Sequence, residues 1–260
     1  MAEGTASYLY CIVRSASKPR TTRVPDGIPG AGPVSLVLVG RNVWIVAASV
    51  PLSTYGPEPL ERGLADMQWV GEVAVAHEAV VEHFARTRGA TVIPMKLFTM
   101  FSSERRASED VKARLDEVRA VLKRINGCEE WGIRVTRASV SPAAGRPGTS
   151  ASSGAAFLAA KKQARDDARR QIEAAAEAAA EAFAVLSRVA RDVRRRDDAP
   201  AGAEAPPLLD AAFLVPVRRL PRFKAVARKA AARCNTAGTH MILTGPWPAY
   251  NFAQPPGTIP

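Results

Sequence analysis

The chain has 260 residues, of which 47% are hydrophobic, and this composition excludes a disordered chain. No apolar run approaches the roughly 20 residues that span a bilayer, and no basic-then-apolar leader opens the chain, so we expect a cytoplasmic protein with no membrane partner. The net charge of +11 is concentrated late, because residues 1–138 carry 18 basic and 15 acidic side chains and residues 139–260 carry 18 and 10.

The first third of the chain predicts three strands and one helix. Residues 8–13 and 34–38 are β-rich apolar runs, and residues 40–42 connect the second run to residues 43–47 as a hairpin. A helix opens at Pro57 and keeps an apolar face as far as Phe84, with Gly71 as a point where it could divide.

The middle of the chain predicts a strand, a second helix and another strand. Residues 91–101 read as a strand that is interrupted or ended near Pro94. Residues 109–125 carry an amphipathic stripe from Val111 to Ile125, and Asn126-Gly127 stops it. A further strand begins at Trp131.

The C-terminal half is organised around one long helix. Residues 155–196 contain no Gly or Pro, and their apolar residues, Phe183 and Leu186 among them, recur at spacings of four and three as in a coiled coil. A strand at 208–217, a helix at 221–235 and a strand at 240–243 follow. From Trp131 the predicted order is therefore β-α-β-α-β.

The last readable segment, residues 244–260, is an extended aromatic arm. Pro246 and Pro248 fix φ and remove backbone donors, which keeps the arm out of a central strand. Trp247, Tyr250 and Phe252 then supply large apolar anchors. We expect these anchors, with Phe183 and Leu186 of the helix seam, to dock a partner or the protein's own domains, and the arm to pack on the N-terminal domain.

Only one cluster invites a metal or acid-base interpretation, and its spacing argues against both. His77 and His83 are six residues apart, whereas a zinc-protease helix needs histidines four apart. We therefore interpret His77 and Glu78 as a structural polar pair. No phosphate-binding or nucleophile motif is present in the sequence, and its three scattered cysteines never form C-x-x-C, so no catalytic residue, metal or cofactor is expected.

Five sequence blocks, in order, resemble the gas vesicle proteins of the GvpF/GvpL family. They are YLYCIV at 8–13, AHEAV at 76–80, IPMKLFTMF at 93–101, EWGIRV at 130–135 and GPWPAYNF at 245–252. The first block has Cys11 where the family pattern has glycine. The resemblance supports a modified ferredoxin-like sheet in the C-terminal half.

These observations predict an α+β protein of two domains, residues 1–127 and residues 128–260, the second ferredoxin-like with the long helix and the arm. The resemblance implies a non-enzymatic gas vesicle protein, located at the vesicle within the cytoplasm. It would be a minor structural component or an assembly factor that binds the hydrophobic shell protein, alongside other gas vesicle accessory proteins. The alternative is a basic nucleic-acid-binding protein, which only the charge supports, and glutamates interrupt the basic residues of the long helix.

Overall fold

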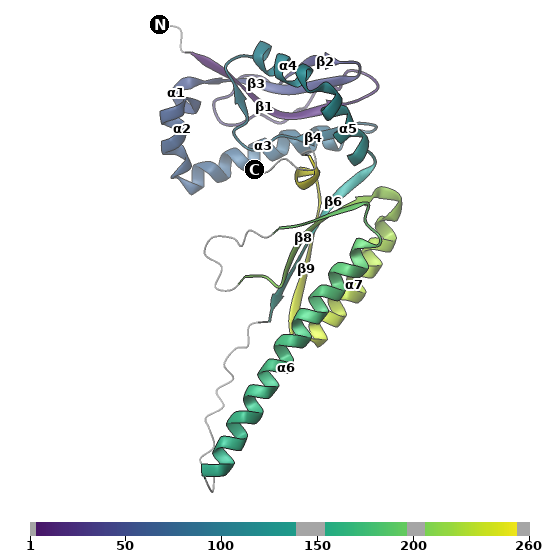
Figure 1. Cartoon of the computed structure of the whole chain (residues 1–260). Coiled ribbons are helices and arrows are strands. Elements are labelled where there is room, and N and C mark those ends of the chain that lie inside the picture. Colours follow the sequence, from purple (N-terminus) through teal and green to yellow (C-terminus); the bar gives the residue numbers. More distant parts are fainter. Residues whose placement is uncertain (1–3, 139–153, 197–205, 254–260) are drawn as a thin grey trace. The chain divides into compact units, whose positions relative to one another are not determined.

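The computed structural model describes residues 4–138, 154–196 and 206–253. The chain divides into two compact units, which Figure 1 shows with their element labels. The first consists of Met1–Glu129 together with Trp247–Pro260, and the second of Glu130–Pro246. Each unit contains its own sheet, its own helices and its own apolar core.

The first unit is built on a five-stranded sheet. Its strands are β1 (Thr5–Arg14), β2 (Ser35–Gly40), β3 (Val43–Pro51), β4 (Thr91–Pro94) and β5 (Met100–Phe101). The order is β2-β3-β1-β4, β5 also pairs with β1, and these neighbours are antiparallel. The predicted hairpin between β2 and β3 is confirmed. Residues 91–101 form two short strands, because the chain leaves the sheet after Pro94.

Five helices complete the first unit, and two of the predicted helices are divided. They are α1 (Leu52–Tyr55), α2 (Pro57–Leu64), α3 (Met67–Ala85), α4 (Glu104–Ala113) and α5 (Leu115–Ile125). The first division lies ahead of Gly71, because the Asp66 side chain accepts the backbone N–H groups of Gln68 and Trp69 and so starts α3. The second lies at Arg114, whose backbone is outside the helical region at φ −110° and ψ 25°.

Helices cover both faces of the β1–β4 pair. Val13 lies opposite Val92 and Ile12 opposite Ile93 in the ladder. The two valines belong to the core that α3 closes, whereas the two isoleucines face α5. This alternation follows from the pleat, in which successive side chains point to opposite faces.

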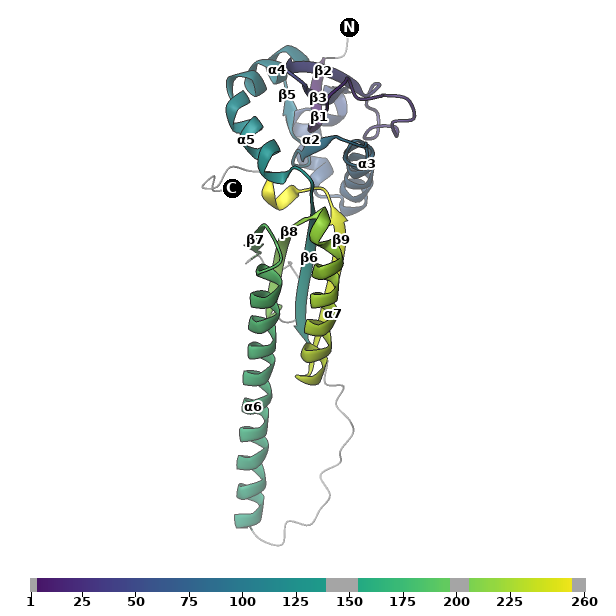
Figure 2. The ribbon, with the colours of Figure 1, turned by 90° about the vertical axis from the view of Figure 1, so that its right-hand side faces the viewer.

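The described residues of the second unit form a four-stranded sheet with two α-helices. Its elements are β6 (Cys128–Arg137), α6 (Gly154–Ser187), β7 (Asp192–Arg195), β8 (Leu209–Pro216), α7 (Leu220–Thr236) and β9 (Thr239–Trp247). A short 3-10 turn, η1 (Val217–Arg219), joins β8 to α7. The strand order is β7-β8-β6-β9. Both helices lie side by side along this sheet (Figure 2).

The predicted helix over 155–196 is wrong at its C-terminal end. α6 stops at Ser187, and β7 then pairs antiparallel with β8, placing Val193 opposite Phe213. All eight residues of β8 are buried, so its backbone groups need partners, which the segment after α6 supplies. Arg196 also donates from its backbone to the Asp210 carbonyl, 2.8 Å away. The observed order is therefore β-α-β-β-α-β, and the predicted β-α-β-α-β lacks one strand.

The C-terminal segment differs from its prediction in two respects. β9 continues through Pro246 to Trp247, a course that proline tolerates because β9 is an edge strand of its sheet. A 3-10 turn, η2 (Tyr250–Phe252), follows, and it belongs to the first unit rather than to a C-terminal domain spanning 128–260. The physical reason is burial, since Phe252 is fully buried there.

Candidate functional site

The C-terminal turn η2 is fastened to two helices of the first unit. Tyr250 Oη donates to Glu78 Oε2 on α3, and the Arg124 guanidinium on α5 donates to the Phe252 carbonyl. The Phe252 side chain is fully buried. The arm thus joins α3 to α5 through one buried ring and two polar contacts that start more than a hundred residues away in the chain.

His77 lies beneath this turn in an aromatic cluster. Its Nδ1 is 2.8 Å from Tyr8 Oη, and its ring contacts Tyr8 and Tyr10 at centroid distances of 5.7 and 5.6 Å. Tyr8 Oη also accepts the Phe98 backbone N–H at 3.4 Å, so it joins His77 to the backbone before β5. Burial lowers the pKa of His77 to about 4. The imidazole is therefore neutral at physiological pH.

The Nε2 atom of His77 has weaker hydrogen bonding than Nδ1. Among the described residues it makes no hydrogen bond of standard geometry, although the nearby Met95 backbone favours the protonated ring slightly. Burial outweighs that contact, because the side chain is 3% exposed.

Glu78 is half-buried and holds the arm. Burial raises its pKa, its hydrogen bond from Tyr250 opposes that shift, and Glu82 adds to it. The pKa of Tyr250 is raised by burial and by the same carboxylate. His77 and Glu78, adjacent in sequence, thus make separate contacts, one with β1 and one with the arm.

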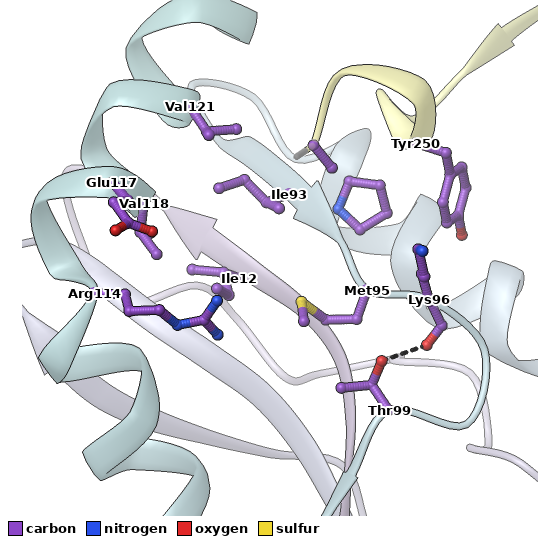
Figure 3. Close-up of a pocket in the computed structure, with 12 residues that line it drawn as sticks. Ile12, Ile93, Met95, Lys96, Thr99, Arg114, Glu117, Val118, Val121 and Tyr250 are labelled. Carbon is purple, nitrogen blue, oxygen red and sulfur yellow. Dashed lines mark hydrogen bonds between the residues drawn. The ribbon is translucent and has the colours of Figure 1, made fainter. Parts of the chain in front are cut away.

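A cavity of about 430 Å³ lies beside the arm, between α5 and the β1–β4 edge of the sheet (Figure 3). Its walls are mostly apolar side chains of the sheet and helix: Ile12, Ile93, Pro94, Met95, Val118 and Val121. The polar residues that line the cavity are Lys96, Thr99, Arg114, Glu117 and Tyr250, and Ala253 completes the lining. Apolar walls with a few polar groups at the mouth are typical of a site for an apolar ligand or side chain.

The charged groups at this mouth are not equivalent. Arg114 forms an ion pair with Asp110 on α4 at 2.6 Å. Lys96 is exposed, and within the described parts of the chain its ammonium forms no ion pair. Lys96 is therefore the cation at the mouth that an incoming carboxylate could pair with.

The sequence analysis identifies Tyr250 as an anchor and His77 as part of a polar pair, but it does not predict the cavity. Ile12, Met95 and Lys96 belong to sequence blocks that carry the family resemblance, as do His77, Glu78 and Tyr250. Three of the five blocks, at 8–13, 93–101 and 245–252, line the cavity, and a fourth, at 76–80, contacts Tyr250 through Glu78. The blocks contain part of the cavity lining, whereas Val118 on α5 is predicted only as a member of the amphipathic stripe and Val121 is not part of that prediction.

The other residues proposed as docking positions lie elsewhere. Trp247 is 47% exposed at the end of β9. Leu186 is fully buried, and Phe183 is half-buried against the Phe213 ring at 5.9 Å. Both α6 residues therefore pack within their own unit, and a partner cannot reach Leu186 in this structure.

Two negative findings apply to the part of the chain that the structure describes. No group of three or more His, Cys, Asp or Glu side chains is placed to hold a metal ion. None of its helices combines the length and apolar character that a bilayer-spanning segment needs.

Comparison with known proteins gives a consistent picture. A family model described as gas vesicle synthesis protein GvpL/GvpF matches residues 6–254. Gas vesicle protein L of Streptomyces sp. (strain CB03234) is 31% identical over 268 residues, covering 97% of this chain and 94% of that protein.

Two crystal structures share the fold. The gas vesicle protein GvpF from Anabaena sp. PCC7120 is similar with a TM-score of 0.66 and 14% identity, covering 96% of this chain and 98% of that one. GvpF from Microcystis aeruginosa is similar with a TM-score of 0.61 and 15% identity, covering 96% and 99%.

Proposed function

Since this chain belongs to the GvpL/GvpF family of gas vesicle synthesis proteins, we propose that it is a non-enzymatic component or assembly factor of gas vesicles that binds the hydrophobic shell protein. It would act at the vesicle within the cytoplasm, during nucleation and assembly, together with other gas vesicle proteins. The observation that supports this proposal is the apolar cavity beside the arm, which residues from three of the five resemblance blocks line.

The cavity suits an apolar anchor of the shell protein. A volume of about 430 Å³ accommodates a few apolar side chains. Burying such side chains stabilises a complex by roughly 25 cal/mol for each Å² of apolar surface removed from water. Lys96 at the mouth adds a charge that selects an anchor with a neighbouring carboxylate.

A filled cavity tests the proposal. Val118→Trp places a large ring in the cavity, and Ala120→Trp adds the same ring on the exposed side of α5. We expect Val118→Trp to reduce co-purification of co-expressed shell protein at least about tenfold, since steric exclusion removes the apolar contacts, and to reduce vesicle formation in parallel. Ala120→Trp should match the parent.

Circular dichroism and thermal unfolding show whether each variant folds as the parent does. If Val118→Trp folds as the parent does and retains parental shell-protein binding, the cavity is not the shell-protein site. A loss shared equally by Ala120→Trp would also contradict the proposal, because that ring lies outside the cavity.

We further propose that the second unit is a ferredoxin-like domain. The support is its element order, β-α-β-β-α-β, together with the strand order β7-β8-β6-β9, in which the first and third strands are central. The sequence prediction reached the same class with one strand too few. Under this proposal α6 and α7 are the two crossover helices, and α6 is extended at its N-terminal end.

A further inference from the structure

The N-terminal half of α6 extends beyond the helix that covers the rest of it. α6 has 34 residues and α7 has 17, and Figures 1 and 2 both show α6 continuing past the end of α7. Residues 154–174 contain no buried side chain. This segment, which we call the α6 overhang, is about 30 Å long at 1.5 Å per residue.

The overhang carries an apolar stripe that continues the buried stripe of α6. The buried stripe consists of Ala175, Ala179, Ala182 and Leu186. At about 100° per residue these four span an arc of about 60°, and an arc of about 120° that includes it contains further apolar residues on the overhang. They are Phe157, Leu158, Ala164, Ala168 and Ile172.

The large members of this stripe are exposed. Phe157 is 59% exposed, Leu158 66% and Ile172 48%. Single apolar residues scattered on a surface are ordinary, whereas several on one helix face in line with a buried stripe indicate a surface that another element covers. In the adjoining half of α6 the sheet and α7 together cover the buried residues, and the side of α6 that carries Phe183 packs on Phe213 of β8.

The charges of the overhang are segregated around the stripe. Lys161 and Arg165 fall inside the arc, are exposed, and form no ion pair among the residues that the structure describes. The three acidic residues, Asp166, Asp167 and Glu173, all fall outside it at about 100° per residue. The stripe is therefore apolar and cationic.

The face of the overhang opposite the stripe carries ion pairs that stabilise the helix. Arg169 pairs with Glu173 and Arg170 with Asp167 at helical spacing, and alanine is abundant. Such pairs stabilise an isolated helix without using the stripe. Within the described ranges, the three large apolar residues of the stripe are exposed and its two cations form no ion pair.

We propose that the α6 overhang docks an amphipathic α-helix of another protein. The partner helix lies along the overhang and covers Phe157, Leu158 and Ile172 with its own apolar face. Asp or Glu residues beside that face pair with Lys161 and Arg165. Alanines at 164 and 168 let the two backbones approach closely. This surface is separate from the cavity of the proposed function and assigns a second partner site.

Charge selects another protein over a second copy of this chain. In a parallel pair of overhangs, Lys161 and Arg165 of one copy meet the same cations of the other at the same level. In an antiparallel pair centred on these residues they meet again. Like charges at a helix interface disfavour both arrangements.

Photo-crosslinking in cells that produce the gas vesicle proteins tests the site. p-Benzoylphenylalanine replaces Leu158 or Ile172 on the stripe, and Gln163 or Asp166 on the opposite side as matched controls. All four positions are exposed, so the substitutions leave the core intact. We expect crosslinks from the stripe only, and mass spectrometry should place them in a helix with apolar residues at three- and four-residue spacing and flanking carboxylates.

Charge reversal provides the second measurement. Lys161→Glu with Arg165→Glu should lower the crosslinking yield from position 158 at least about fivefold, since two attractive pairs become repulsive. Lys162→Glu with Arg170→Glu changes the same net charge off the stripe and should leave the yield unchanged. Crosslinks to a second copy, equal yields from both sides, or no crosslinks at all would each overturn the proposal.

The crosslinking results for the overhang do not depend on the binding results for the cavity variant. Crosslinks from position 158 are read directly, whether or not Val118→Trp affects shell-protein binding. A protein whose cavity variant binds normally but whose overhang crosslinks as expected would refute the proposed function and leave this inference standing.

Discussion

His77 is a neutral imidazole held in an apolar site, and its protonation should destabilise the first unit. Its pKa is about 4 in the folded state and about 6.5 in the unfolded state. Stability from this group is therefore complete above pH 6.5 and is lost as the pH falls from 6.5 towards 4. The loss amounts to at most about 3 kcal/mol.

His77→Asn isolates that contribution. Asparagine keeps a polar atom near the position of Nδ1 for Tyr8 but does not titrate. Urea unfolding at intervals between pH 4 and 8 should show a free-energy difference between parent and variant that narrows as the pH falls. The raised pKa of Glu78 acts in both proteins and cancels in this difference. A difference that stays constant with pH would mean that folding does not lower the pKa of His77.

Asp210 is a buried carboxylate of the second unit that pairs with two arginines. Its side chain is 3% exposed and pairs with Arg134 of β6 and with Arg196 after β7, each at 2.6 Å. Because both arginines are partly exposed, solvent screens the pairs, and we expect Asp210→Asn to cost about 1–3 kcal/mol of unfolding free energy. Asp166→Asn on the exposed face of α6 is the matched control and should be neutral. Equal stability of the two variants, measured by chemical denaturation, would contradict this role.

The arm's aromatic residues should differ sharply in their energetic importance. Phe252 is fully buried and Trp247 is 47% exposed. Phe252→Ala should therefore destabilise the first unit by about 3–5 kcal/mol through lost apolar burial and a cavity. Trp247→Ala, a larger truncation at an exposed position, should cost less than about 1 kcal/mol. Thermal unfolding of both variants checks this order, and a reversed order would refute the assigned role of η2.

At the element scale, the elements predicted from sequence were those with a local signal. The β2–β3 hairpin, α7 and most of α6 follow from alternation, turn residues and helical spacing. β7 could not be predicted, because Asp192-Val193-Arg194-Arg195 has one apolar residue and no alternation. Its strand conformation depends on the unpaired edge of the buried strand β8, which local sequence does not reveal.

The candidate site shows the same limit. The resemblance blocks identified Tyr250, His77 and Glu78, but the contact between Tyr250 and Glu78 joins residues 172 positions apart. Similarly, α4 and α5 separate at Arg114 without any Gly or Pro to mark the break. Contacts between distant parts of the chain determine both the Tyr250–Glu78 contact and the break at Arg114. Spacing along the chain therefore could not show that Tyr250 and Arg114 line one cavity.

For the whole molecule, the net charge of +11 should not produce specific nucleic-acid binding. Several arginines of the second unit are already paired, including Arg169, Arg170 and Arg233 with carboxylates on α6. We expect duplex DNA to bind only in the non-specific range of about 10⁻⁴ to 10⁻⁶ M at physiological salt. Fluorescence anisotropy with two unrelated duplexes should give equal, salt-sensitive affinities. Nanomolar binding to one duplex only would instead support the alternative hypothesis of a nucleic-acid-binding protein.

The composition of the first unit from two distant segments has a consequence for biosynthesis. Residues up to Glu129 leave the ribosome long before Trp247, with the whole second unit made in between. At typical translation rates that interval is on the order of ten seconds. Throughout it, the nascent N-terminal unit lacks Tyr250 and Phe252, so α3 and α5 remain unfastened. The apolar cavity walls are then uncovered on the side that the arm later closes, and a ribosome-associated chaperone or an early vesicle protein would meet them in that open form.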